Sequence, residues 1–123
     1  MTAVAARSRR PIVDQVHREA PERVVCRLLI PSDECFLSSH FPGLRIVPGM
    51  MLVGWVVAIA AQHFDLGRFM GLSTAKFRRP LRPGERIELA LDWQPDVHRL
   101  RYACRLGDVE CARGTLEFGH DDV

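Results

Sequence analysis

His40 lies in the segment His40-Phe41-Pro42-Gly43, which combines a titratable side chain with a stiff backbone. An imidazole takes up and returns protons near neutral pH, so His40 is a candidate general base. Phe41 precedes a proline, which restricts it to extended conformations and stiffens the segment that presents the imidazole. A lone histidine in a loop is also often a surface or capping residue. The residue type alone leaves both interpretations open.

The longest apolar stretch of the chain, residues 46–61, follows this segment. It is shorter than the roughly 18 consecutive apolar residues that a membrane span requires. Proline is tolerated in the first turn of a helix and disfavoured deeper in it, so we expect a helix from Pro48 to about His63. Apolar residues on every face of a helix are typical of a helix that its own protein buries.

The hydrophobic period changes after this helix. Apolar residues alternate with small or polar ones from Ile87 to Trp93 and from Leu100 to Leu106, the pattern of half-buried strands. Turn residues such as Pro83-Gly84 and Gly107-Asp108 separate these segments. The sequence therefore predicts one or two strands before the helix and four antiparallel strands after it, with the less regular ones at residues 23–30, 69–79 and 109–118.

This order of elements predicts the fold class. A single apolar helix is buried only if a sheet wraps around it, so we expect an α+β protein with one antiparallel sheet of five or six strands curled over the helix, the hot-dog architecture. The curled sheet leaves an edge strand, and edge-to-edge pairing of two such sheets predicts a dimer. We expect residues 11–119 to form this domain, with a flexible arm at residues 1–10 and a tail at residues 120–123.

Composition narrows the functional class. The chain has 123 residues and a formal charge of +2, which suits one compact domain. All but one of its 17 basic residues are arginine and they are interspersed with 15 acidic residues, a pattern that argues against nucleic-acid binding. Residues 1–10 lack the apolar stretch of a signal peptide. We expect a cytoplasmic protein with no metal site and with buried free thiols at its four cysteines, Cys26, Cys35, Cys104 and Cys111.

Two motifs carry a resemblance to a known family. The segment from His40 to Gly49, HFPGLRIVPG, resembles the His-Phe-Pro-Gly…Pro-Gly signature of the 3-hydroxyacyl-[acyl-carrier-protein] dehydratases, which are hot-dog proteins. Residues 76–85, KFRRPLRPGE, are similar to the strand-and-turn segment of that family. The resemblance covers about residues 24–118. Trp55 and the Trp93 strand are most similar to the small dehydratases of aryl-polyene and related polyketide-like pathways.

The resemblance implies a chemistry for these residues. His40 would remove the α-proton of a 3-hydroxyacyl thioester, and the Gly49 N–H at the helix N-terminus would stabilise the negative charge on the thioester oxygen. The acyl chain would lie in an apolar tunnel along the helix, and an acidic acyl carrier protein would dock on arginines, without any cofactor. A solvated face is the alternative for these arginines. The substrate-binding candidates are Phe41, Pro48, Met50, Met51, Val53, Gly54 and Trp55, and the docking candidates are Arg78, Arg79 and Arg82.

One position departs from the family. Its members carry Glu or Asp on the helix five residues after the glycine of Pro-Gly, where this chain has Gly54. No acidic residue lies between Glu34 and Asp65, and Asp65 is roughly 16 Å further along the helix. The carboxylate is therefore missing rather than moved nearby. Glycine inside a helix costs up to about 1 kcal/mol relative to alanine, so its presence suggests that space is needed there or that the acid is not.

Three interpretations remain open. The protein is a dehydratase in which His40 shuttles protons while water, Asp33 or Glu34 assists the leaving hydroxyl. It is instead a catalytically impaired subunit that pairs with an intact homologue, so that His40 faces the partner's carboxylate in one complete site. Or it is an acyl-thioester binding protein or a thioesterase on the same fold. The sequence does not decide between a homodimer and a heterodimer, and the space at Gly54 suits a bulky or conjugated acyl group.

Overall fold

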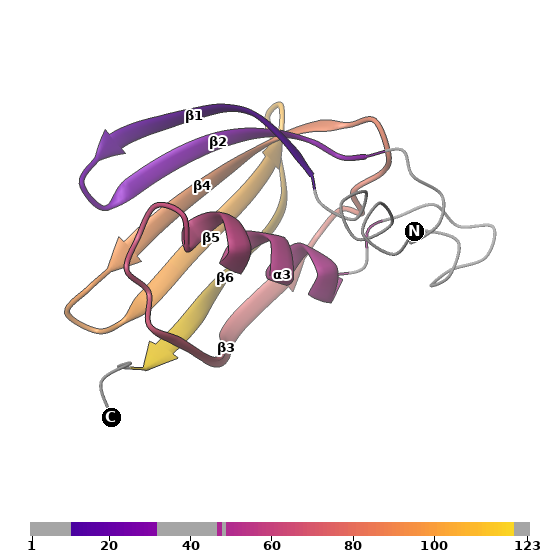
Figure 1. Ribbon diagram of the computed structural model, residues 1–123. Helices are drawn as coiled ribbons and strands as arrows, with labels where there is room; N and C mark the ends of the chain where they lie inside the picture. Colours follow the sequence, from indigo (N-terminus) through magenta and orange to yellow (C-terminus); the bar gives the residue numbers. More distant parts are fainter. Residues whose placement is uncertain (1–10, 32–46, 48, 120–123) are drawn as a thin grey trace, which may run out of the picture.

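The computed structural model describes residues 11–31, 47 and 49–119, and its six-stranded sheet curves around one helix (Figure 1). The order of strands is β1-β2-β4-β5-β6-β3, and every neighbouring pair is antiparallel. The predicted sheet around a helix is thus confirmed, whereas the arm at residues 1–10 and the tail at residues 120–123 lie outside the described residues. The elements are β1 (Ile12–Ala20), β2 (Arg23–Leu29), α3 (Gly49–Ala60), β3 (Arg68–Phe77), β4 (Arg86–Gln94), β5 (Arg99–Leu106) and β6 (Val109–Gly119).

The alternation in β4 and β5 separates the two faces of the sheet, as predicted. Side chains such as Leu89, Leu91 and Leu100 are fully buried on the inner face, where they pack against α3. Their neighbours along the same strands point outward and are largely charged, as in Arg86 and Arg101. The inner face therefore supplies the core that positions the helix.

Helix α3 ends at Ala60, three residues before the predicted end. The N–H groups of Gln62 and His63 donate to the carbonyls of Ile59 and Ala60, three residues back, at 3.0 Å each. These bonds tighten the last turn and stop the helix. The prediction of a helix to His63 is wrong because the sequence 61–63 continues as a turn.

One face of α3 is open in the single chain, so this chain alone does not bury every face of the helix; whether a second subunit covers it stays a prediction. Met50 is 62% exposed, and Gly54 and Ala58 follow it on the same side of the helix, one and two turns later, and are also exposed. The helix contains no charged residue. The opposite side packs on the sheet through Leu52, Val53, Trp55, Val56, Ile59 and Ala60.

The two edge strands differ from the prediction. β3 ends at Phe77 rather than residue 79, because the N–H groups of Arg78 and Arg79 both donate to the carbonyl of Cys111, at 2.7 and 3.1 Å, where the chain leaves the edge. β1, which the sequence left as an optional strand, forms the other edge, and all nine of its residues are exposed. Without a buried face, β1 has no clear alternation to detect.

The thiols behave as predicted where the structure describes them. Cys26, Cys104 and Cys111 are buried and free, and Cys35 lies outside the described residues. Burial raises the pKa of the Cys104 thiol to about 12 and also raises that of Cys26. The described part of the chain has no cluster of three metal-ligating side chains. Nor does it have a helix that is long and apolar enough to cross a membrane.

Candidate functional site

The two sequence motifs meet at the N-terminus of α3. Gly49 is the first residue of the helix, and the tip of the Phe77 ring, from the end of β3, lies against it. A Cβ atom at residue 49 would lie 2.9 Å from Cζ of Phe77, so any larger residue would displace the ring. Phe77 itself is 49% exposed. The first N–H groups of a helix lack partners within the helix, so this end offers donors beside an accessible aromatic ring.

The loop at residues 78–85 holds the segment that precedes the helix. The N–H of Val47 donates to the carbonyl of Leu81 at 2.8 Å, and both side chains are buried. The same loop is also bonded to the chain after β2, because the N–H of Ile30 donates to the carbonyl of Glu85 at 2.9 Å. The position of Gly49 therefore depends on this loop as well as on the helix.

An ion pair closes the loop internally. The Arg79 guanidinium donates to both carboxylate oxygens of Glu85, at 3.1 and 2.8 Å, and the backbone N–H of Arg82 donates to the same carboxylate at 2.8 Å. Hydrogen bonding from Arg79 is the largest cause that lowers the pKa of Glu85, although burial opposes it. We call this arrangement the Arg79–Glu85 latch.

The latch changes the interpretation of the docking arginines. Arg79 is engaged with Glu85 and with the carbonyl of Pro80, so its charge is largely used within the loop. Arg82 is exposed and only its backbone contacts Glu85. Arg78 is exposed too, with its Nε 3.8 Å from a carboxylate oxygen of Glu110. Arg78 and Arg82 are therefore exposed, whereas Arg79 is engaged in the latch, and docking at the three arginines stays a prediction.

The predicted substrate residues do not share one surface. Val53 and Trp55 are buried in the core, and Met51 is partly buried against it. Met50 and Gly54 lie on the open side of α3. The remaining candidates, His40, Phe41 and Pro48, lie outside the described residues, so their roles stay predictions.

Gly54 faces open space. No heavy atom of the protein would lie within 4 Å of a Cβ atom at this position. The absence of a side chain is therefore not required for packing in the single chain. A longer side chain at residue 54 would project from the open face of the helix.

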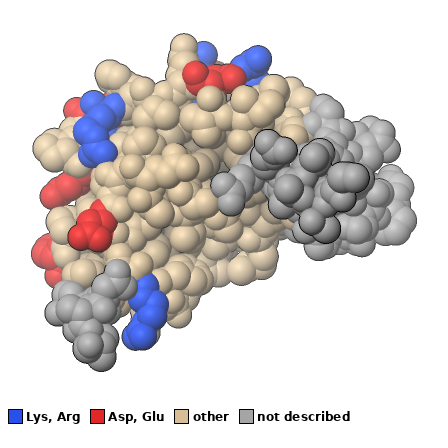
Figure 2. All heavy atoms as spheres, viewed as in Figure 1, with Lys and Arg blue, Asp and Glu red and all other residues tan. Residues whose placement is uncertain are grey.

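The open face of α3 continues onto the neighbouring edge strand. Phe69, Met70, Leu72 and Phe77 are exposed apolar residues of β3, and Met50 adds another from the helix. Figure 2 shows that few charged side chains lie on this face of the molecule and that they lie toward its margins. An uncharged apolar surface of this kind marks an interaction or binding site in proteins.

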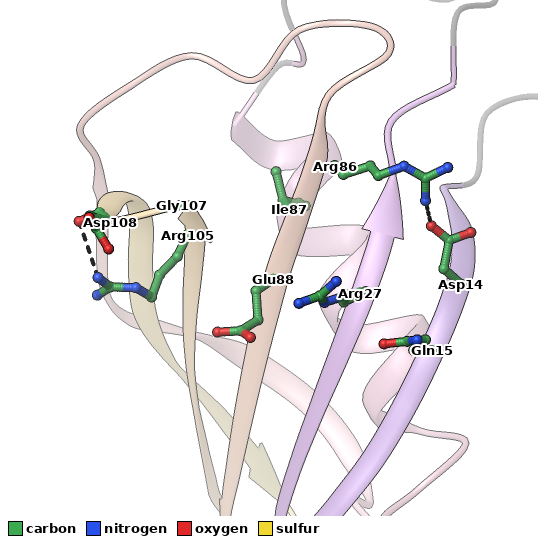
Figure 3. A pocket seen from close by; sticks show the side chains of 9 residues that line it. All are labelled: Asp14, Gln15, Arg27, Arg86, Ile87, Glu88, Arg105, Gly107 and Asp108. Carbon is green, nitrogen blue, oxygen red and sulfur yellow. Dashed lines mark hydrogen bonds and ion pairs between the residues drawn. The ribbon is translucent and has the colours of Figure 1, made fainter.

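A different hollow lies on the outer face of the sheet. It has a volume of about 520 Å³ and is mainly charged and polar: Arg86 forms an ion pair with Asp14, and Arg105 donates to the carbonyl of Asp108 at 3.1 Å (Figure 3). It lacks the apolar walls that an acyl chain requires. The sequence did not point to this hollow, and it is separate from the helix N-terminus.

Sequence reasoning missed two residues that shape the site. In the sequence, Phe77 and Glu85 were only part of a motif shared with a family. In the structure, Phe77 contacts Gly49, and Glu85 closes the loop that contains Leu81. A signal for Glu85 was present, since an acidic residue follows the Pro83-Gly84 turn within an arginine-rich segment. The contact of Phe77 with Gly49 is long-range and has no local signal.

Comparisons with known proteins point to one family. A family model described as ApeI-like: ApeI dehydratase matches residues 16–115. The chain is 30% identical over 107 residues to the 3-hydroxyacyl-[acyl-carrier-protein] dehydratase FabZ of Koribacter versatilis, which covers 77% of this chain and 69% of the relative. With FabZ of Campylobacter concisus it shares 28% identity over 124 residues, 86% of this chain and 84% of the relative. With FabZ of Syntrophobacter fumaroxidans it shares 32% identity over 89 residues, 65% of this chain and only 60% of the relative.

Solved structures share the fold. The dehydratase heterocomplex ApeI:P from Xenorhabdus doucetiae matches with a TM-score of 0.81 and 24% identity over 88% of this chain and 96% of that one. An uncharacterized protein from Erwinia carotovora subsp. atroseptica matches with a TM-score of 0.71 and 25% identity, covering 87% and 94%. Mouse thioesterase superfamily member2 matches with a TM-score of 0.64 at 14% identity, covering 94% and 86%. These likenesses confirm the predicted hot-dog fold.

Proposed function

Because the chain belongs to the ApeI-like dehydratase family, we propose that it takes part in the dehydration of 3-hydroxyacyl thioesters that are attached to an acyl carrier protein. The observation that carries this proposal is the N-terminus of α3, where Gly49 lies against Phe77 beside an uncharged apolar surface. Helix N–H groups can bind a developing oxyanion, and the apolar surface can accept an acyl chain.

The proposed reaction divides the work between two groups of this chain. His40 takes the proton from the carbon next to the thioester carbonyl, and electron density moves onto the thioester oxygen. The N–H of Gly49 and the positive end of the α3 dipole stabilise that oxygen. As the double bond forms, the bond from C3 to its hydroxyl breaks, and the hydroxyl leaves as water after it accepts a proton.

The source of that last proton is where this chain departs from its family. Gly54 occupies the position of the usual carboxylate, and none of the residues 35–64 is acidic. A homologous partner that faces the open side of α3 could supply a carboxylate, while this chain supplies His40. The space at Gly54 and the likeness to one chain of the ApeI:P heterocomplex favour this second form of the proposal, a heterodimeric dehydratase.

This chain also offers a surface on which a partner subunit could pack. β3 is an edge strand of the sheet that the described residues form, and its exposed Phe69, Met70 and Leu72 continue the apolar face of the helix. Edge-to-edge pairing would cover both. An acyl-thioester binding protein or a thioesterase would use the same surface, but the likeness to mouse thioesterase superfamily member2 at 14% identity extends only to the fold.

Docking of the carrier protein is proposed at Arg78 and Arg82. Both are exposed residues of the loop that holds the helix N-terminus, and carrier proteins are acidic. Opposite charges on the two surfaces would speed the encounter and orient the acyl chain toward Gly49. Charge reversal of both arginines should therefore slow turnover at low salt and matter less at high salt.

The test is loss of water from carrier-protein thioesters. The purified protein is incubated with 3-hydroxyacyl carrier protein, alone and together with a homologous subunit that retains the helix carboxylate, and the acyl mass is followed. We expect turnover that disappears in His40→Ala. Turnover with the partner only would identify the heterodimeric form, whereas no loss of water under either condition would reject the proposal.

Gly54 offers a sharper version of this test. Because a Cβ at residue 54 meets no neighbour, Gly54→Glu should fold normally and gain up to about 1 kcal/mol of helix stability. We expect it to increase activity without a partner at least tenfold by restoring an acid. Gly54→Gln is the matched control, with the same shape and no acid. Equal activity of the two variants would contradict the proposal that residue 54 is the position of the missing catalytic carboxylate.

A further inference from the structure

The inner face of the sheet carries one polar side-chain group that the proposed mechanism does not use. Tyr102, the only tyrosine of the chain, is 3% exposed, and its hydroxyl is buried with no hydrogen-bond partner. Around it the core is apolar, with Leu91 as its neighbour on β4 and Cys104 two residues along β5. A buried hydroxyl without a partner is unfavourable, and a phenylalanine would fill almost the same volume without that cost.

The neighbouring strand is shaped around this hydroxyl. Gly114 pairs with Tyr102 across β5 and β6, and a Cβ atom at residue 114 would lie 2.7 Å from Cε2 and 2.8 Å from the hydroxyl oxygen of Tyr102. The ring therefore lies across β6, in the space that a side chain at residue 114 would fill. On its other side, Gly114 of β6 pairs with Ala75 of β3, the strand at the edge of the sheet. The hydroxyl thus extends from the centre of the sheet toward the β3 edge and lies beside Gly114.

The Tyr102 hydroxyl lies close to a row of side chains, paired across the strands, that leads to the helix N-terminus. Cys104, Ala112 and Phe77 are paired in the adjacent row of the same inner face, and Phe77 contacts Gly49. Adjacent rows on one face are two residues apart along a strand, roughly 7 Å. An acyl chain whose thioester lies at Gly49 and whose tail enters between α3 and β3 would pass the Tyr102 row.

The chemistry of the group limits what it can recognise. Burial raises the pKa of Tyr102, so the phenol keeps its proton and can donate a hydrogen bond. The buried residues described for this chain include no charged side chain that could balance an anion. The matching ligand group is therefore a neutral oxygen.

We propose that the Tyr102 hydroxyl hydrogen-bonds a neutral oxygen on the acyl chain, a hydroxyl or carbonyl beyond the reacting carbons, and so selects oxygen-bearing acyl groups. This inference rests on the proposed function, because it takes the acyl chain to bind inside the fold. A site built to hydrogen-bond an oxygen strongly disfavours an analogue that lacks it, since the protein group is then left unpaired. Tyr102 would in this way determine specificity without taking part in water loss.

The test measures binding rather than turnover. Two carrier-protein analogues are prepared with a non-reactive amide in place of the thioester and with acyl chains that differ only in one distal hydroxyl. We expect the wild-type protein to bind the hydroxylated chain about tenfold to 100-fold more tightly. Tyr102→Phe should abolish this preference and leave affinity for the plain chain unchanged. Its thermal unfolding temperature should equal or exceed that of the wild type, because an unpaired buried hydroxyl has been removed.

A neighbouring variant controls for general effects on the core. Cys104→Ala alters the same inner face and should keep the preference for the hydroxylated chain. Equal affinity of the wild-type protein for both analogues would overturn the inference and leave the proposed function intact. Clear destabilisation by Tyr102→Phe would also overturn it, because the hydroxyl would then have a partner within the protein. If neither analogue binds at all, the proposed function fails together with the inference.

Discussion

The two ends of α3 are built in opposite ways. At the C-terminal end, Trp93 makes ring contacts with Phe64, Phe118 and His98, at centroid distances of 6.5, 5.8 and 5.8 Å. At the N-terminal end, the described contacts are the Phe77 ring on Gly49 and one hydrogen bond from Val47. One end is thus enclosed by aromatic packing, whereas the described residues make only these two contacts at the other end, which we call the open end.

An arginine reinforces the enclosed end. The Arg18 guanidinium on β1 donates to the carbonyl of His63 at 2.8 Å and to that of Pro21 at 2.6 Å, and it lies 5.3 Å from the centre of the Phe64 ring. These contacts tie β1 to the turn that follows α3. The firmly packed end therefore lies a full helix length from the end at which we propose that the thioester binds.

The largest effect is expected at the enclosed end. Trp93→Ala removes a side chain that is almost fully buried among three rings and should lower the free energy of unfolding by about 3–5 kcal/mol. Activity per folded molecule should change little. Denaturant unfolding would measure the loss of stability, and the water-loss assay would measure the activity. Trp55→Ala is the matched comparison, since Trp55 is equally buried but lies on the helix next to Gly54, and we expect it to impair both properties. Equal loss of activity in the two variants would show that packing and activity are not separated along the helix.

The open end should respond in the reverse manner. Gly49→Ala brings a methyl group to 2.9 Å from the Phe77 ring, so the ring or the first helical turn must shift. Small displacements of catalytic groups reduce rates steeply, and we expect activity to fall about 100-fold while stability changes by only about 1 kcal/mol. Phe77→Leu in the same chain should restore space and recover part of the activity. A double variant that is no better than Gly49→Ala would show that the ring contact is not the cause.

The difference between the ends also explains what the sequence could predict. The strands with one buried face, such as β4 and β5, were predictable because alternation records burial directly. The open face of α3 was not, because an apolar helix looks the same whether its own sheet or another molecule covers it. The motifs placed Gly49 at a helix start, but the contact with Phe77 depends on how β3 returns beside the helix, and no local pattern encodes that.

The smallest effect should come from the Arg79–Glu85 latch, which supports the open end through the loop that bonds to Val47. The folded pKa of Glu85 is lowered, so its stabilisation is complete above the unfolded value of about 4.3 and is lost as the pH falls through the folded value. Glu85→Gln should therefore be about 1 kcal/mol less stable than the wild type near pH 7, and this gap should close in acid. Denaturant unfolding from about pH 7 to about pH 3 would measure it.

Glu88→Gln, on the exposed outer face of β4, is the control and should change stability by less than about 0.5 kcal/mol throughout this range. Because Glu85 acts on the helix N-terminus only through the loop, its loss should reduce activity severalfold and less than Gly49→Ala does. A stability gap that does not vary with pH would mean that Glu85 holds the loop by its shape rather than by its charge. Among the described residues, the Leu81–Val47 bond and the Phe77 contact would then be what holds the open end.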